Sequence, residues 1–451
     1  MVRRRHSPEH AAVAERNRMP RVRIVAGIAI MAVVLAACIA TFAFCFFFSQ
    51  PSGGGSSQQQ GSSLAEQGHQ SLNRQSSAPD PVLRHPGNAP DCPDTDCISV
   101  MVNGDLLFHP NLWNSFAGAN TAAKDGTAFN FDPLFEGMKP YIQSSDIAVC
   151  EFETPIAQRG GPYAGYPVFA IPPEVVDSAA RIGYKACTHA TNHSWDQGLA
   201  GIERLHQELA SHGIAQTGSY LTQEESLEPL VIDSPTGGGK LGLVTGTVSL
   251  NGMVADTDWR IDRLRASGEP EHDADIQRAV DKAHKARSQG ADVVAMAMHS
   301  LQEYIDYADS WQVSEAHELA DTGAFDVIYG AGCHCVQPVE YYHGTWIIYG
   351  LGNAVTVSAP QSRVVNNQGI TARIQFAGKR GAEGTWRVNR IDWVPVANMR
   401  QGQYRWCPIA SDHPDGVCWS DGQDAAVRER ISQVLYSMNA DPAVVKEWLL
   451  G

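Results

Sequence analysis

Apolar runs of strand length alternate with helix-like stretches through the middle of the chain. The runs that predict strands are 98–102, 146–150, 185–189, 241–248, 293–298, 326–330 and 345–349. The stretches between them predict helices at 173–182, 199–212, 275–288 and 313–321. Strand and helix in alternation are typical of an α/β domain.

The pattern changes toward the C-terminus. Residues 371–376 and 386–396 predict consecutive antiparallel strands, and residues 423–436 predict a last helix. We therefore expect a main α/β domain at 96–400, followed by a C-terminal extension at 401–451.

A nearly unbroken apolar run covers residues 24–48 and contains one polar residue, Thr41. About 25 residues suffice to cross a bilayer, so the run predicts a single transmembrane helix. Seven arginines precede it, which predicts a cytoplasmic basic tail at 1–23 and an extracytoplasmic main domain. Residues 35–38 resemble a lipoprotein box around Cys38, but the apolar sequence continues past it and favours an uncleaved anchor in the cell membrane.

The segment 49–95 is expected to be a disordered linker. Up to residue 91 it is rich in Gly, Ser, Gln and Pro and has almost no large apolar side chains. Such a composition cannot bury enough surface to offset the conformational entropy of the chain. The linker would hold the main domain away from the membrane.

The charge of the chain and its cysteines limit which partners and which cellular compartment are expected. The 49 acidic residues outnumber the 34 basic ones, giving a net charge of -15, so nucleic acid is not expected as a partner. Two close cysteine pairs, Cys92 with Cys97 and Cys407 with Cys418, are disulfide candidates in an exported domain. Cys150 and Cys187 lie on predicted strands, where a buried free thiol is expected.

Side chains that can bind metals follow five of the predicted strands. Oxygen and imidazole ligands at successive strand ends are how an α/β fold usually builds a polar or metal site. The candidate metal ligands are Asp105, Glu153, Asn192, His299 and His334, with His193 beside Asn192 and Glu303 four residues after His299.

Each of these segments also has an ordinary structural explanation. Asn192 and Asp196 suit turn and helix-capping positions, and a carboxylate after a strand is often a cap or a surface charge. A histidine at a strand end is more often buried and hydrogen-bonded than a ligand. Recurrence at five strand ends favours a shared site over five coincidences.

In order and spacing, these segments resemble the capsule-synthesis CapA family of the calcineurin-like metallophosphatase superfamily. The resemblance runs from about residue 98 to residue 353. The matching elements are Gly104-Asp105, Asp146 with Glu153-Thr154-Pro155, Asn192-His193 with Asp196 and Gly198, His299 with Glu303-Tyr304, Gly330 with His334 and Gln337-Pro338, and Tyr349-Gly350-Leu351-Gly352-Asn353. The resemblance implies a four-layer α/β/β/α metallophosphatase-like sandwich with its site at the strand ends.

The resemblance also implies roles for single residues. Asp105 and His334 would bind a first metal, Asn192 and His299 a second, and Glu153 would bridge the two. His193 and His299 would be the catalytic histidines, which stabilise charge on the reacting group. Glu303 and Asn353 would contact substrate.

The chain departs from the superfamily pattern at two histidine positions. Leu107 stands where the first motif has the histidine of Asp-x-His, and Gly332 stands where the last motif has its first histidine. Each metal would therefore lose one ligand. We expect one Mn, Mg or Zn ion rather than two, or none.

Two main functions remain open from the sequence, besides a general phosphatase unrelated to capsule, which the sequence does not exclude. The first is a membrane-anchored protein of capsule, poly-γ-glutamate or other cell-envelope polymer synthesis, acting as a metal-dependent hydrolase on phosphoesters or as an amide-bond transferase. The alternative is a non-catalytic anchored component that binds or exports the polymer and keeps a degenerate metal site. Either would work with the membrane and with an anionic surface polymer or its synthase subunits.

Overall fold

The computed structural model describes residues 92–117, 129–300, 302–357, 368–382, 384–400, 403–419 and 421–450. The transmembrane helix expected at 24–48, the basic tail and the linker up to residue 91 lie outside the described residues. In the described ranges, no helix combines the length and the hydropathy needed to cross a bilayer.

Two mixed sheets form the centre of the described domain. In the first, the strand order is β14-β13-β12-β1-β2-β3-β4, with β11 paired to β1 and β15 paired to β13. Its strands are β1 (Asp96–Leu106), β2 (Ile147–Glu151), β3 (Ala186–Thr188), β4 (Ala215–Thr217), β11 (Asn353–Val355), β12 (Gln368–Gly378), β13 (Arg387–Arg400), β14 (Gln403–Pro408) and β15 (Val445–Glu447). Strands β1 to β4 run parallel, and β12 to β14 continue the sheet antiparallel.

The second sheet has the order β5-β6-β7-β8-β10-β9. Its strands are β5 (Leu230–Asp233), β6 (Lys240–Thr247), β7 (Val293–His299), β8 (Val327–Ala331), β9 (Val339–Tyr342) and β10 (Thr345–Ile348). The four inner strands are parallel, and the two edge strands are antiparallel to their neighbours. Inner strands that are buried on both faces explain why their sequences are continuous apolar runs.

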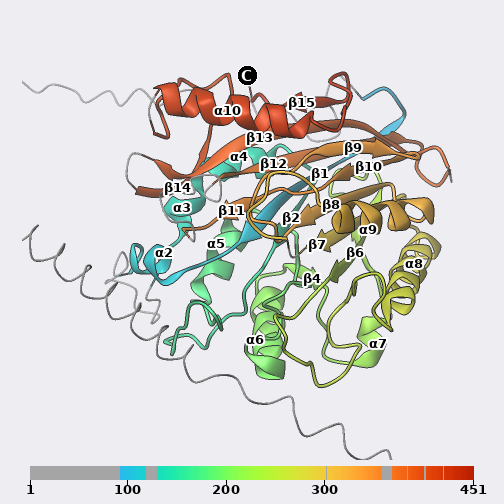
Figure 1. Ribbon diagram of the computed structural model, residues 1–451, viewed down its shortest axis with the longest axis horizontal. Coiled ribbons are helices and arrows are strands. Elements are labelled where there is room, and N and C mark those ends of the chain that lie inside the picture. The colour runs from blue at the N-terminus through green and yellow to red at the C-terminus, as the bar shows by residue number, and fades with distance from the viewer. Residues whose placement is uncertain are drawn as a thin grey trace, which may run out of the picture. The chain divides into compact units, whose positions relative to one another are not determined.

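Helices cover the outer face of each sheet (Figure 1). The longer ones are α5 (Glu174–Ile182) and α6 (Gly198–Ser211) on the first sheet, and α8 (His272–Ser288) and α9 (Ser310–Asp321) on the second. The short ones are α2 (Pro110–Asn114), α3 (Asp132–Phe135), η1 (Glu136–Met138), α4 (Lys139–Gln143) and α7 (Gln223–Ser226).

Three apolar cores join these layers. Val100 of β1 and Ala295 of β7 share the core between the sheets. Met101, which points to the other face of β1, packs with the α5 and α6 side, and Met296 packs with α8 and α9. The layers therefore follow the order helix, sheet, sheet, helix that the family resemblance implies.

The C-terminal segment is built into the first sheet. Val445 of β15 pairs with Ile391 of β13, and α10 (Asp421–Leu435) buries Ile431 and Leu435 in the core between the sheets. Residues 403–450, which the sequence suggests are an extension, thus share the core of the main domain.

Cysteine pairing differs from the expectation at one place. The structure joins Cys92 to Cys97 and Cys407 to Cys418, and it also joins Cys150 to Cys187. The expectation of two free thiols at 150 and 187 is wrong, because parallel β2 and β3 place these residues directly opposite each other. Strand register of this kind cannot be read from the sequence. Cys333 and Cys335 are both buried.

Candidate metal centre

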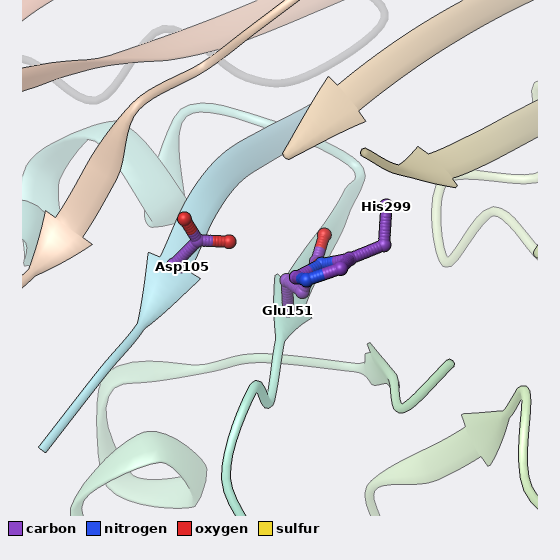
Figure 2. A group of neighbouring side chains, drawn as sticks. All are labelled: Asp105, Glu151 and His299. Carbon is purple, nitrogen blue, oxygen red and sulfur yellow. The ribbon is translucent and has the colours of Figure 1, made fainter. Parts of the chain in front are cut away.

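The ends of three strands bring acidic and imidazole side chains to one place. Asp105 lies near the end of β1, Glu151 ends β2 and His299 ends β7. These strands belong to both sheets, and Figure 2 shows Asp105 directed toward the Glu151–His299 pair. Loops that follow β2, β3 and β8 add Glu153, Asn192 and His334.

Asp105, Glu153 and His334 form the first group of potential ligands. Their donor atoms lie within 4.8 Å of one another. His334 Nδ1 is 2.8 Å from Asp105 Oδ2, and His334 Nε2 is 3.8 Å from Glu153 Oε1. The Gly332 N–H donates to Asp105 Oδ1 at 3.0 Å and holds the carboxylate in place.

Asp105, Glu151 and His299 form the second group, with donor atoms again within 4.8 Å of one another. His299 Nδ1 is 2.5 Å from Glu151 Oε1, and His299 Nε2 is 3.2 Å from Asn192 Oδ1. Asp105 therefore belongs to both groups. The family resemblance implies that Glu153 bridges two metals, whereas in the structure Asp105 is the residue that the two ligand groups share.

Glu153 shows that these residues fit a cation. The side chain is fully buried, and neither carboxylate oxygen has a hydrogen-bond partner among the residues described. A buried carboxylate without a donor is strongly destabilised, so burial raises the pKa of Glu153 to about 7. A divalent cation between Glu153, Asp105 and His334 would provide the missing charge. Oxygen and imidazole donors suit Mn, Mg or Zn.

Protons take part in the charge balance of the metal-free site. Burial lowers the pKa of His334, but the charges on Glu153 and Asp105 outweigh burial and raise this pKa to about 10. For His299, burial is likewise outweighed, chiefly by Glu151, and the pKa is raised. Metal ligands must be deprotonated, so cation binding here would release protons and weaken in acid.

The structure explains the glycine at position 332. Gly332 has φ +82°, and a Cβ atom there would lie 2.4 Å from the Ser300 carbonyl oxygen and 2.7 Å from His299 Nε2. The ring of His299 thus takes the space that a side chain at 332 would need. The histidine that the superfamily motif has at this position cannot fit beside His299.

Gly332→Ala should therefore disturb the site as well as the fold. We expect a loss of about 3 kcal/mol or more in the free energy of unfolding, from left-handed strain and the clash, together with weaker metal binding as His299 moves. Chemical denaturation and elemental analysis measure the two effects. Gly323→Ala is the matched control, because Gly323 has φ +69° but nothing within 4 Å of its added Cβ. Equal metal content in both variants would contradict the proposed packing.

A cavity of about 840 Å³ opens beside the first ligand group. Polar and aromatic side chains surround it. Its lining is Leu107, His109, Glu153, Tyr166, Pro167, Val168, Phe169, Asn192, His193, Asn251, Met253, Glu303, Tyr304 and His334. The site thus has room for a substrate next to the potential metal ligands.

His193 is held in one orientation at this cavity. Its Nδ1 lies 2.8 Å from Asp196 Oδ2, and the same oxygen accepts the Phe169 N–H at 2.7 Å. With the Nδ1 proton directed to Asp196, Nε2 is the ring atom that can accept a proton, and Asn251 Nδ2 lies 3.5 Å from it. Asp196 is therefore a positioning residue for His193, although a turn or capping role is the simpler expectation from sequence.

The two predicted substrate-binding residues lie in different environments. Glu303 lines the cavity, as a substrate-binding residue should. Asn353, also predicted to bind substrate, is completely buried, and its Oδ1 lies 3.0 Å from His334 Nδ1. The pairing of β11 with β1 places Asn353 opposite Asp105, next to the ligand groups. Asn353 therefore positions the ring of His334 and is buried away from the cavity.

Sequence reasoning missed two residues of the site. Glu151 is the last residue of β2 and directly follows an apolar run. An acidic residue at the end of a predicted strand was the signal that could have identified it. His109 lines the cavity, and burial lowers its pKa to about 4, so its ring is neutral near pH 7. It lies two residues after Leu107, where the superfamily motif has a histidine.

Comparison with known proteins agrees with the resemblance seen in the sequence. The model of the family described as "Bacterial capsule synthesis protein PGA_cap" matches residues 99–358. The chain belongs to this family. The resemblance to capsule-synthesis proteins of the CapA type is thereby confirmed.

Curated relatives of the PGA_cap chain match it over part of their length. The PGA biosynthesis protein CapA of Bacillus subtilis is 25% identical over 268 residues, covering 58% of this chain and 65% of that protein. A probable polyglutamine synthesis accessory protein of Mycobacterium tuberculosis is 24% identical over 216 residues, covering 47% and 56%. The chain therefore spans somewhat less than two thirds of the length of these relatives.

One solved structure aligns with this chain at low similarity. The calcineurin-like phosphoesterase YfkN from Bacillus subtilis aligns with a TM-score of 0.38 and 13% identity, over 75% of this chain and 97% of that chain.

Proposed function

We propose that this PGA_cap protein is a metal-dependent enzyme of capsule or poly-γ-glutamate production, which hydrolyses a phosphoester or transfers or hydrolyses an amide bond. One observation carries the proposal: two ligand groups share Asp105 beside a cavity of about 840 Å³. The names of the curated relatives support the assignment to capsule and polyglutamate synthesis.

The residues of the site divide the chemical work. A bound divalent cation would stabilise negative charge that develops on a carbonyl or phosphoryl oxygen. Asp105 would hold it, either with Glu153 and His334 or with Glu151 and His299. His193, oriented by Asp196, would donate from Nε2 to the reacting group when protonated or accept a proton there when neutral. Phe169 and Leu107 add apolar surface to the cavity lining.

The proposed location is the outer side of the cell membrane. Three disulfides in the described domain support an oxidising compartment, because such bonds rarely persist in the cytosol. The apolar run at 24–48 supports a single-pass anchor. The partners would be the membrane, an anionic surface polymer and the synthase subunits that make it.

The proposed function predicts a strong phenotype for His299→Ala. Without this ring, the second ligand group keeps two carboxylates and loses its nitrogen donor, so metal content should fall and surface polymer should drop at least about tenfold. The measurements are polymer on cells that lack their own copy of the gene, and metal in the purified protein. His284→Ala, at an exposed position of α8, is the control. A variant without metal that still supports normal polymer would favour the non-catalytic alternative.

The proposed topology predicts protease release from intact cells. A protease added outside should cut the linker at 49–91, which has the composition of a flexible tether, and free a fragment that contains the disulfide-bonded domain. Immunoblotting of the supernatant measures the release. Permeabilised cells provide the positive control. Full protection in intact cells would place the domain on the cytoplasmic side.

A further inference from the structure

A second cluster of potential metal ligands lies in the helical layer over the second sheet. His272 is the first residue of α8, while Glu315 and Glu318 lie one turn apart on α9. One donor atom of each residue lies within 4.8 Å of the others. None of these three residues lines the cavity beside Asp105 and Glu153, so the cluster is separate from the proposed active site.

The backbone holds the His272 ring in the tautomer that a ligand requires. His272 Nδ1 lies 2.7 Å from the Arg265 carbonyl oxygen and donates its proton there. This leaves the lone pair on Nε2, which lies 3.0 Å from Glu318 Oε2. Metal-binding histidines commonly donate their other ring N–H to a backbone carbonyl in this way. Two lone-pair donors at this distance repel each other unless a proton or a cation lies between them.

Glu315 provides independent evidence that a positive charge belongs here. Its side chain is 1% exposed, and Oε1 is buried without a hydrogen-bond partner in the described part of the chain. Its Oε2 faces the His272 ring, 3.9 Å from Nδ1. Arg265 and Arg278, two arginines of this region, pair with Asp275 instead.

We propose that His272, Glu315 and Glu318 bind one divalent transition-metal ion, and that zinc fits best. Imidazole nitrogen and carboxylate oxygen both bind zinc, with bonds of about 2.0–2.2 Å. The cluster must contract from its present spread, and Glu318, whose side chain is 43% exposed, has room to move inward. The same open side leaves a fourth position for water.

Such an ion would connect the start of α8 to α9. Both helices pack on the outer face of the sheet that contains β7 and His299. The ion would therefore stabilise the second sheet without touching substrate. A metal that binds only the folded state raises the melting temperature, and the rise grows with the logarithm of the metal concentration relative to its Kd.

The test measures zinc binding with the active-site ligand groups disabled. The full-length chain with Asp105→Asn is dialysed against zinc chloride, and bound zinc is measured by elemental analysis alongside the melting temperature. We expect about one equivalent of zinc and a zinc-dependent rise in Tm. Adding Glu315→Gln should remove both. Adding Glu271→Gln, an exposed acid next to His272 outside the cluster, should remove neither.

Two results would overturn the proposal. Equal zinc in the Asp105→Asn protein with and without Glu315→Gln would show that the cluster binds no zinc. If Glu315→Gln does not fold, as judged by circular dichroism, Glu318→Gln at the half-exposed position decides. A zinc affinity at least tenfold weaker in Glu318→Gln supports the site, and an unchanged affinity means that His272 and Glu318 share a proton instead. Neither result depends on the proposed enzymatic activity.

Discussion

Asp105→Asn is expected to abolish both metal binding at the strand ends and polymer production, with the fold retained. Asp105 belongs to both ligand groups, so one substitution weakens both. Asparagine keeps the shape and an oxygen that can accept the Gly332 N–H, which now donates at 3.0 Å. It removes the negative charge that a divalent cation requires. We expect metal affinity and activity to fall about 100-fold or more.

The comparison with His299→Ala makes this experiment informative about the number of ions. His299 belongs to one ligand group only, so two ions bound at the strand ends predict a partial loss of this metal in His299→Ala and its complete loss in Asp105→Asn. A single ion at the Glu153 side predicts a near-normal content in His299→Ala. Elemental analysis of both variants after dialysis against manganese or zinc separates these cases.

Asp132→Asn is the matched control for Asp105→Asn. Asp132 carries the same functional group but is half-exposed and pairs with Arg181 on the surface. It should leave metal content and polymer unchanged. Wild-type metal content in Asp105→Asn would contradict the proposed centre.

The central strands were predictable because burial on both faces leaves a plain signal. Residues 293–298 form β7 with a difference of one residue, and residues 98–102 lie within the longer β1. Short strands have no such signal. β4 (Ala215–Thr217) and β11 (Asn353–Val355) are three residues long and depend on pairing with neighbours that are distant in sequence. Local propensity therefore could not locate them.

The ligand set was predictable only in part, for a related reason. Recurrence after strands indicated Asp105, Asn192, His299 and His334, which do meet. Glu151 was missed because β2 is buried on both faces, so no alternation of polar and apolar residues shows which acids turn toward the site. The position of Asn353 behind His334 depends on the pairing of β11 with β1, which is a tertiary contact. Contacts across layers decide such roles.

Glu153→Gln is expected to stabilise the metal-free protein and to abolish its stabilisation by metal bound at the strand ends. In the folded state, burial raises the Glu153 pKa from 4.5 to about 7. The folded protein thus binds a proton that the unfolded chain releases above about pH 4.5. Stability of the metal-free protein should fall as the pH rises from about 4.5 to about 7 and then level off, for this group. The loss is on the order of 3 kcal/mol.

His334 adds to the same trend at higher pH. Its folded pKa is raised to about 10 from 6.5, so its contribution is complete below pH 6.5 and is lost as the pH rises through 10. Glutamine at 153 removes the ionisable group and also one of the charges that raise the His334 pKa. The dependence of stability on pH should therefore flatten in Glu153→Gln, most clearly between pH 5 and pH 8.

Urea denaturation of chelator-treated and metal-loaded protein at pH 5 and pH 8 measures both effects. Metal-free Glu153→Gln should be more stable than metal-free wild type at pH 8, and the order should reverse when metal is added, because the wild type alone keeps this carboxylate ligand. Glu224→Gln, at an exposed position of α7, should behave as wild type. If metal-free Glu153→Gln is less stable than metal-free wild type at pH 8, neighbouring groups of the protein already stabilise the buried charge of Glu153. The case for a cation at Glu153 would then fail.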